Sequence, residues 1–174
     1  MVRLPNANCW AHARRAFADA VKAADKKDPQ AVKSSVAYRA LQKIAEFYSI
    51  DTGLKELPKE ERLKQRQEKI QPMVEEFFAW VKQQVSEYAV PPKSKTGQGL
   101  NFIINQEKYL KVFLTDGDVP IDNSASERAI RTFCVGKKNW MFHNTARGAE
   151  ASALVYSISE TAKLNNLRPV SYTH

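Results

Sequence analysis

The chain has 174 residues, of which 43% are hydrophobic and 26% are charged, the usual proportions in soluble globular proteins. This length can bury a core in one or two domains, and no apolar run approaches the roughly 20 residues of a membrane-spanning helix, so we expect no membrane partner. The formal net charge of +8 favours a polyanionic partner, because basic side chains attract phosphates of any sequence, although a generic basic protein would carry the same charge.

The start of the chain lacks the pattern of a secretory signal peptide, because polar asparagines follow directly on residues 1–5. The two cysteines, Cys9 and Cys134, do not make a disulfide framework, and a reducing compartment is the simpler interpretation. We therefore expect a cytoplasmic protein.

The first part of the chain predicts the end of a strand that runs into a helix, with Asn6 or Asn8 as its cap. Apolar residues recur there at helical spacing, namely Trp10, Ala13, Phe17 and Val21. An amphipathic helix is predicted next, from Ala31 to Tyr48, on the spacing of Val36, Ala37, Leu41, Ile44 and Phe47 or Tyr48.

A long helix is predicted after Pro58, which takes the first position that helices favour for proline, with Glu60 and Glu61 in the first turn. Pro72 is expected to kink this helix or to split it in two. Residues 90–93 then form a linker, and another helix is indicated by Leu100, Ile103, Ile104, Leu110, Phe113 and Leu114.

The last third of the chain predicts a short helix near Ser124, an extended turn from Cys134 to Phe142 and a final helix from about Ala146 to Leu164. The fold class is therefore mainly α, with at most a short strand or hairpin. The helices between about residues 30 and 115 contain few candidate catalytic groups, so we expect any chemistry at the two ends of the sequence.

Glu127 is the candidate catalytic residue, because it places one carboxylate on the first turn of a helix beside two arginines. In metal-dependent nucleotidyl transfer, carboxylates hold two Mg²⁺ ions roughly 4 Å apart. Residues 124–127 also have the spacing of a capping box, in which the glutamate only returns to the backbone N–H of the cap residue. Both interpretations are open from the spacing alone.

The neighbouring basic residues have two interpretations as well. Arg128 and Arg131 could hold phosphates, or Arg131 could form an ordinary ion pair with Glu127 one helical turn away. Lys137 and Lys138 precede Trp140, a combination that can follow a nucleic-acid backbone and stack on a base, or form a solvated turn over a core aromatic ring.

Cys9 and His12 are metal-ligand types at close spacing, but a zinc site requires four ligands. The other ligand-like residues, Cys134, His143 and His174, form no second paired motif, so zinc is disfavoured. A Cys-His hydrolase is rejected, because no oxyanion motif or orienting acid accompanies the pair.

Several segments, in the same order, resemble the C-terminal signature of insertion-sequence 66 family transposases. The clearest is Asp-Asn-Ser-Ala-Ser-Glu-Arg-Ala-Ile-Arg at 122–131, followed by Gly-Lys-Lys-Asn-Trp-Met-Phe at 136–142. Three further segments match at 9–17, 147–151 and 156–165. The departures are modest: Ser124 replaces a usual asparagine, Thr132 a common proline and Lys137 a common arginine.

The resemblance implies a bacterial Asp-Asp-Glu transposase with a ribonuclease H-like catalytic core, in which Glu127 is the final acid and binds Mg²⁺ or Mn²⁺. It divides the chain into the end of the core with its following helix (1–28), a helical insertion (29–115) and a C-terminal core segment (116–174). The two catalytic aspartates of the family lie upstream, so we expect a fragment that is inactive alone and binds no metal by itself.

The resemblance also implies partners: DNA, as terminal repeats and target, and further copies of the chain in a multimer near the nucleoid. The expected DNA-binding residues are Arg14, Arg15, Arg128, Arg131, Lys137, Lys138 and Arg147. The alternative is a non-catalytic basic helical module that binds nucleic acid or protein, with Glu127 only a helix cap.

Overall fold

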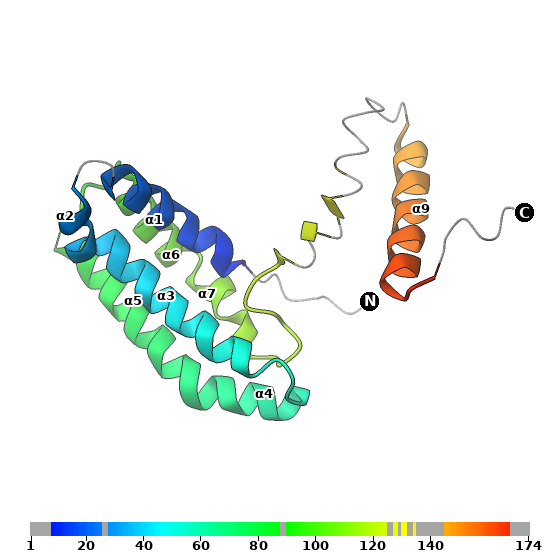
Figure 1. The fold of residues 1–174 in the computed structure, drawn as a ribbon, viewed down its shortest axis with the longest axis horizontal. Helices are drawn as coiled ribbons and strands as arrows, with labels where there is room; N and C mark the ends of the chain where they lie inside the picture. Colours follow the sequence, from blue (N-terminus) through cyan, green and yellow to red (C-terminus); the bar gives the residue numbers. More distant parts are fainter. Residues whose placement is uncertain are drawn as a thin grey trace, which may run out of the picture. The chain divides into compact units, whose positions relative to one another are not determined.

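The computed structural model describes residues 8–25, 28–87, 90–124, 127–128, 130–131, 134 and 145–167. These ranges contain helices and no strand, which confirms the mainly α fold class (Figure 1). The chain divides into two compact units, Met1–Asn123 and Ser124–His174. None of the described helices is long and apolar enough to cross a membrane.

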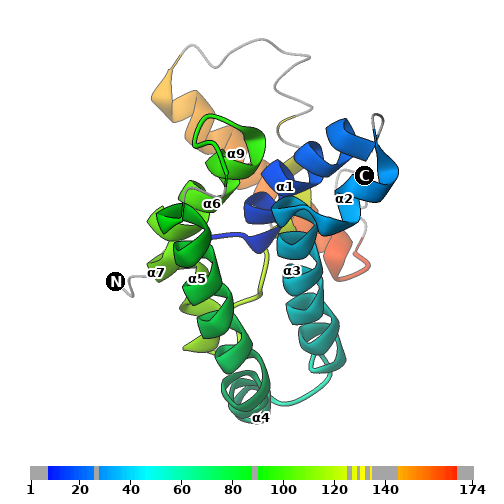
Figure 2. The ribbon, with the colours of Figure 1, turned by 90° about the vertical axis from the view of Figure 1, so that its left-hand side faces the viewer.

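The first unit is a helical bundle in which α1 packs against α3 and α6, and α5 packs against α6 and α3 (Figures 1 and 2). Its larger helices are α1 (Trp10–Asp25), α3 (Val36–Gly53), α5 (Gln71–Ser86) and α6 (Lys95–Asn105). Shorter elements connect them: α2 (Pro29–Ser34), α4 (Lys59–Gln65), α7 (Glu107–Leu110) and a 3₁₀ turn (Val112–Leu114).

Polar caps set where the helices of this unit begin. The Asp28 carboxylate accepts hydrogen bonds from the backbone N–H groups of Gln30 and Ala31 at the start of α2. Ser35 accepts one from the N–H of Tyr38 and begins α3. Such caps satisfy N–H groups that have no partner within the helix.

The long helix predicted after Pro58 is divided into α4 and α5, which a π-helical turn, Arg66–Ile70, joins just before Pro72. The N–H of Gln71 donates to the carbonyl of Arg66 across this wider turn, and α5 then starts with the proline in its first turn. Proline is tolerated there because its missing N–H would have no partner in a first turn.

The helix predicted around residues 100–114 is divided into α6, α7 and the 3₁₀ turn. The N–H of Gln106 still donates to Phe102, but the next turns are tightened. This shortening lets backbone carbonyls of the segment face other parts of the unit.

The Trp10 side chain is fully buried at the centre of the first unit. Its ring centroid lies 5.3 Å from that of Phe47, 5.9 Å from Phe77 and 6.1 Å from Phe78. Its indole Nε1–H donates to the carbonyl of Leu110 at 2.8 Å, so the polar atom of this large side chain is satisfied. Trp10 therefore ties α1 to α3, α5 and α7.

A buried guanidinium holds the segment after α7. Arg66 is only 3% exposed and donates from Nε to the Asp51 carboxylate at 2.7 Å. Its Nη1 donates to the carbonyls of Phe113 at 3.0 Å and Val119 at 2.8 Å. A buried charge requires such partners, because removal from water is costly unless the charge is paired and hydrogen-bonded.

The turn between these two carbonyls packs against the start of α4. A Cβ atom at Gly117 would collide with the backbone carbonyl of Lys59, so glycine is required by close approach. The Lys59 ammonium reaches Asp116 and Asp118, at 2.9 Å each. The chain is thus led in a defined path toward residue 121.

The second unit contains α9 (Ala146–Leu164), whose predicted bounds are confirmed. The Thr145 hydroxyl accepts a hydrogen bond from the N–H of Gly148 and caps this helix. None of its residues is buried, and large apolar side chains are exposed at Leu154, Val155, Ile158 and Leu164. Ser124, Glu127, Arg128, Ile130, Arg131 and Cys134 are also helical.

We predict that Arg66→Leu lowers the free energy of unfolding by about 3–5 kcal/mol, because Asp51 would be left as an uncompensated buried charge. The double variant Asp51→Leu/Arg66→Leu should lose less, because it removes both charges. Urea unfolding followed by circular dichroism measures both. Lys43→Ala, which removes the exposed pair with Glu76, is the control and should cause no measurable change. Equal losses in the single and double variants would contradict a role for charge pairing.

Candidate functional site

The start of α1 is the meeting point of three parts of the first unit. The N–H of Asn8 donates to the carbonyl of Tyr109, and the N–H of Trp10 donates to the carbonyl of Ile121. The carbonyl of Cys9 accepts from His12 and Ala13, so Cys9 begins the helix. Cys9 therefore occupies the position before the helix that the sequence predicted for Asn6 or Asn8.

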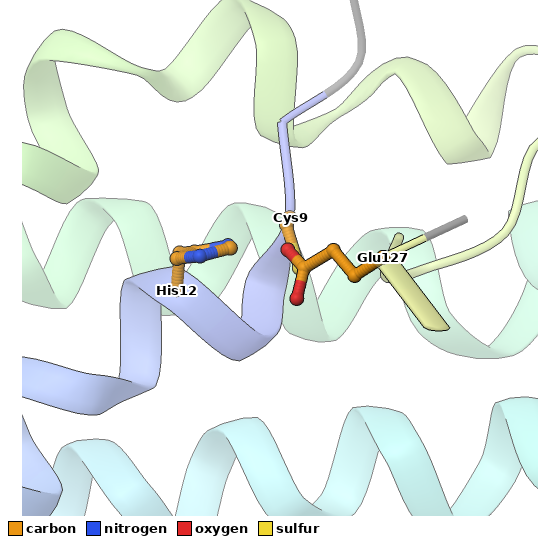
Figure 3. A group of neighbouring side chains, drawn as sticks. All are labelled: Cys9, His12 and Glu127. Atoms are coloured by element: carbon orange, nitrogen blue, oxygen red, sulfur yellow. The ribbon is translucent and has the colours of Figure 1, made fainter. Parts of the chain in front are cut away.

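Cys9 also contacts the first residues of the 122–131 segment. Its side chain is buried, at 5% exposure, and its Sγ accepts a hydrogen bond from the backbone N–H of Asn123 at 3.4 Å. His12 lies one turn further along α1 and is exposed (Figure 3). Cys9 is a free cysteine, in agreement with the absence of a predicted disulfide framework.

Tyr48, from α3, completes the surroundings of Asp122. The hydroxyl oxygen of Tyr48 is buried. Burial raises the pKa of this hydroxyl far above its usual range, the negative charge of Asp122 raises that pKa further, and Arg14 partly opposes them. Tyr48 is therefore a neutral hydroxyl beside a carboxylate at neutral pH.

The arginines predicted to contact DNA in the first unit, Arg14 and Arg15, are exposed on α1. The positive charge of Arg14 lowers the pKa of the Tyr48 hydroxyl, against the larger effect of burial. Arg15 is the next residue along the helix. Both guanidinium groups can reach solvent, as a phosphate contact requires.

Glu127 belongs to the second unit and is exposed on its helix. Arg128 and Arg131 are exposed there too, and Arg147 is exposed in the first turn of α9. Glu127 is therefore not enclosed in a core, and its carboxylate oxygens are the ligand type that Mg²⁺ prefers.

Some predicted residues lie outside the described ranges. These are the two candidate DNA-binding residues Lys137 and Lys138, the aromatic Trp140 beside them, and the two histidines His143 and His174. The extended turn predicted from Cys134 to Phe142 is wrong at its first residue, because Cys134 is helical and exposed. The other residues of that predicted turn lie outside the described ranges.

Sequence reasoning did not single out Tyr48 or Arg66 as site-related residues. Tyr48 was visible only as one end of an apolar stripe, and Arg66 only as one of several charges in the long helix. A buried polar side chain can be recognised only from its hydrogen-bond partners. Those of Arg66 lie 15 to 53 residues away in the chain, so the local sequence does not indicate its burial.

Comparison with known proteins identifies the family. The profile described as "Transposase IS66 family" matches residues 2–151. The chain belongs to the IS66 family of transposases. The resemblance of the 122–131 segment and its companions to this family is thereby confirmed.

Three similar proteins, all from Sinorhizobium fredii (strain NBRC 101917 / NGR234), are the uncharacterized proteins y4hP, y4qI and y4jD. They are 32%, 28% and 27% identical over 168, 166 and 164 residues, which is 94%, 95% and 94% of this chain. The chain spans only 30%, 29% and 30% of their lengths. No solved structure matches this IS66 family chain.

Proposed function

We propose that this chain is the C-terminal portion of a DNA transposase that cuts and joins strands by metal-dependent phosphoryl transfer. Glu127 would be its metal ligand and the last acid of an Asp-Asp-Glu triad. Membership of the IS66 family carries the proposal, together with the exposed carboxylate of Glu127 in a segment that matches the family signature. A ribonuclease H-like core is the fold that this proposal requires of the complete enzyme.

Divalent ions, Mg²⁺ or Mn²⁺, would activate the attacking oxygen of a DNA 3′-hydroxyl or water and stabilise the leaving oxygen. Glu127 alone does not provide the ligands for two ions. Two aspartates in the upstream part of a longer chain would provide the others. The chain covers 30% of the length of y4hP, so this relative is long enough to include a further part. This portion by itself is therefore proposed to be inactive.

The basic residues would hold the DNA backbone. Arg14, Arg15, Arg128, Arg131 and Arg147 are exposed, and guanidinium groups form strong, often bidentate hydrogen bonds with phosphates. Lys137 and Lys138 are included on the family motif alone. The net charge of +8 adds attraction to DNA of any sequence.

Self-association is part of the proposal. Leu154, Val155 and Ile158 are each more than half exposed and lie within one face of α9 at helical spacing. A second copy of the chain would cover apolar area that a monomer leaves in water. A multimer would also allow two element ends to be held together.

The catalytic part of the proposal is tested in a longer chain that includes the upstream aspartates. Glu127→Gln should reduce Mg²⁺-dependent cleavage of terminal-repeat DNA by about a thousandfold, because a charged metal ligand is worth several kcal/mol in the transition state. Glu150→Gln, the same exchange at another exposed glutamate of this unit, is the control and should retain activity. Cleavage by Glu127→Gln at the unmodified rate would assign Glu127 to a helix cap instead.

The DNA-binding part is tested on the 174-residue chain by fluorescence anisotropy with a duplex oligonucleotide between 50 and 200 mM salt. Arg128→Ala/Arg131→Ala should weaken binding and reduce the slope of log affinity against log salt by about two. The matched control is Lys43→Ala/Lys82→Ala, which also removes two positive charges. These two lysines form ion pairs with glutamates of the first unit. Equal effects of the two double variants would show that only net charge matters, against a local contact.

A further inference from the structure

Two backbone links hold the approach to the Glu127 helix at the start of α1. The carbonyl of Ile121 accepts from the N–H of Trp10 at 3.3 Å, and the N–H of Asn123 donates to the Cys9 thiol at 3.4 Å. The residues on the two sides are more than a hundred positions apart in the chain. Cys9 and Trp10, at the start of α1, are therefore hydrogen-bonded to residues 123 and 121 of the approaching segment.

The residues on both sides of Cys9, Asn8 and Trp10, are themselves anchored. Trp10 is fully buried among aromatic rings, and its Nε1–H bond to Leu110 fixes the orientation of the ring. Asn8 adds bonds to Tyr109 through its backbone and to Gln106 through its side chain, the latter at 2.6 Å. Cys9 lies between these two anchored residues, so its thiol has little freedom to move.

Burial in the core also surrounds the same segment. The Tyr48 hydroxyl of α3 is buried, and burial together with the negative charge of Asp122 raises its pKa. Ile121, which is 6% exposed, inserts into the hydrophobic core just before these residues. The segment 121–123 is thus held by core burial and by hydrogen bonds to the start of α1.

The chain between Asn123 and Glu127 is short. Glu127 follows Asn123 by four residues, and four residues span at most about 14 Å even when fully extended. Along the chain, Glu127 is therefore close to the held Asn123 amide.

We propose that Cys9 is a positioning residue, whose thiol holds the Asn123 amide and so restrains the chain four residues before Glu127. This inference rests on the proposed function, because it takes Glu127 to be a metal ligand. The proposal gives the cysteine of the Cys-x-x-His string a hydrogen-bonding role, since its side chain is buried and its Sγ already accepts from a backbone N–H.

The first test uses the 174-residue chain and follows hydrogen exchange of the Asn123 amide. Cys9→Ala should speed this exchange by about fivefold, the equivalent of one hydrogen bond, while Cys9→Ser, which keeps an acceptor, should restore much of the protection. Cys134→Ala, at the exposed cysteine, should leave it unchanged. The amide of Phe77 in α5 reports whether the whole bundle is loosened.

Unchanged exchange at Asn123 in Cys9→Ala would overturn the proposal. So would equally faster exchange at Asn123 and Phe77, since the cysteine would then only support general stability. Stoichiometric zinc in the purified chain that is lost in Cys9→Ser would also overturn it, and would make Cys9 a metal ligand.

The second test measures Mg²⁺ dependence of DNA cleavage in the longer chain. Cys9→Ala should raise the Mg²⁺ concentration for half-maximal rate severalfold with little change at saturating Mg²⁺, and Cys9→Ser should reverse most of the shift. An unchanged Mg²⁺ requirement, with Glu127→Gln inactive, would overturn the positioning of the acid and leave the proposed function intact. Activity in Glu127→Gln would instead overturn the proposed function, and the amide exchange at Asn123 would still report the Cys9 bond.

Discussion

Burial of Trp10 fixes the start of α1, and the arrangement of the candidate site depends on it. The ring is inaccessible to solvent and contacts aromatic side chains from α3, α5 and the 3₁₀ turn. Because large aromatic side chains dominate the energy of a core, this contact is the strongest reason for α1 to stay in place. Cys9 precedes this anchor by one residue, and the segment that leads to Glu127 is bound to both.

Arg66 holds the chain just before residues 121–123. It binds carbonyls at Phe113 and Val119, while Cys9 and Trp10 bind residues 121–123. The helical bundle therefore does more than fill space: it defines the path of the chain between α7 and the family signature.

Much of the helical pattern could be predicted from the sequence, because periodic apolar residues and caps act locally. The bounds of α9 and the burial of Trp10, Ala13 and Phe17 agree with those patterns. The π-helical turn before Pro72 and the division of residues 100–114 could not be predicted. Arg66, inside the π-helical turn, and Trp10 form long-range hydrogen bonds with Phe113 and Leu110, and the periodicity of the sequence does not record such bonds.

The candidate site shows the same division. Glu127 was selected from its spacing, its arginines and the family resemblance, all of which are visible in a short stretch of sequence. The contact of Cys9 with Asn123 joins residues separated by 114 positions, and the sequence offered metal binding as the more familiar use of Cys9 and His12. Only packing shows that the thiol is buried against a backbone amide.

The central claim is that the Glu127 carboxylate binds a divalent ion beside DNA. Anomalous diffraction from Mn²⁺ in crystals of the longer chain with terminal-repeat DNA tests it most directly. We predict a Mn²⁺ ion about 2.1 Å from a Glu127 carboxylate oxygen, a distance typical of Mg²⁺-type sites. Mn²⁺ bound only elsewhere, with the Glu127 side chain turned back onto the N–H of Ser124, would contradict the account.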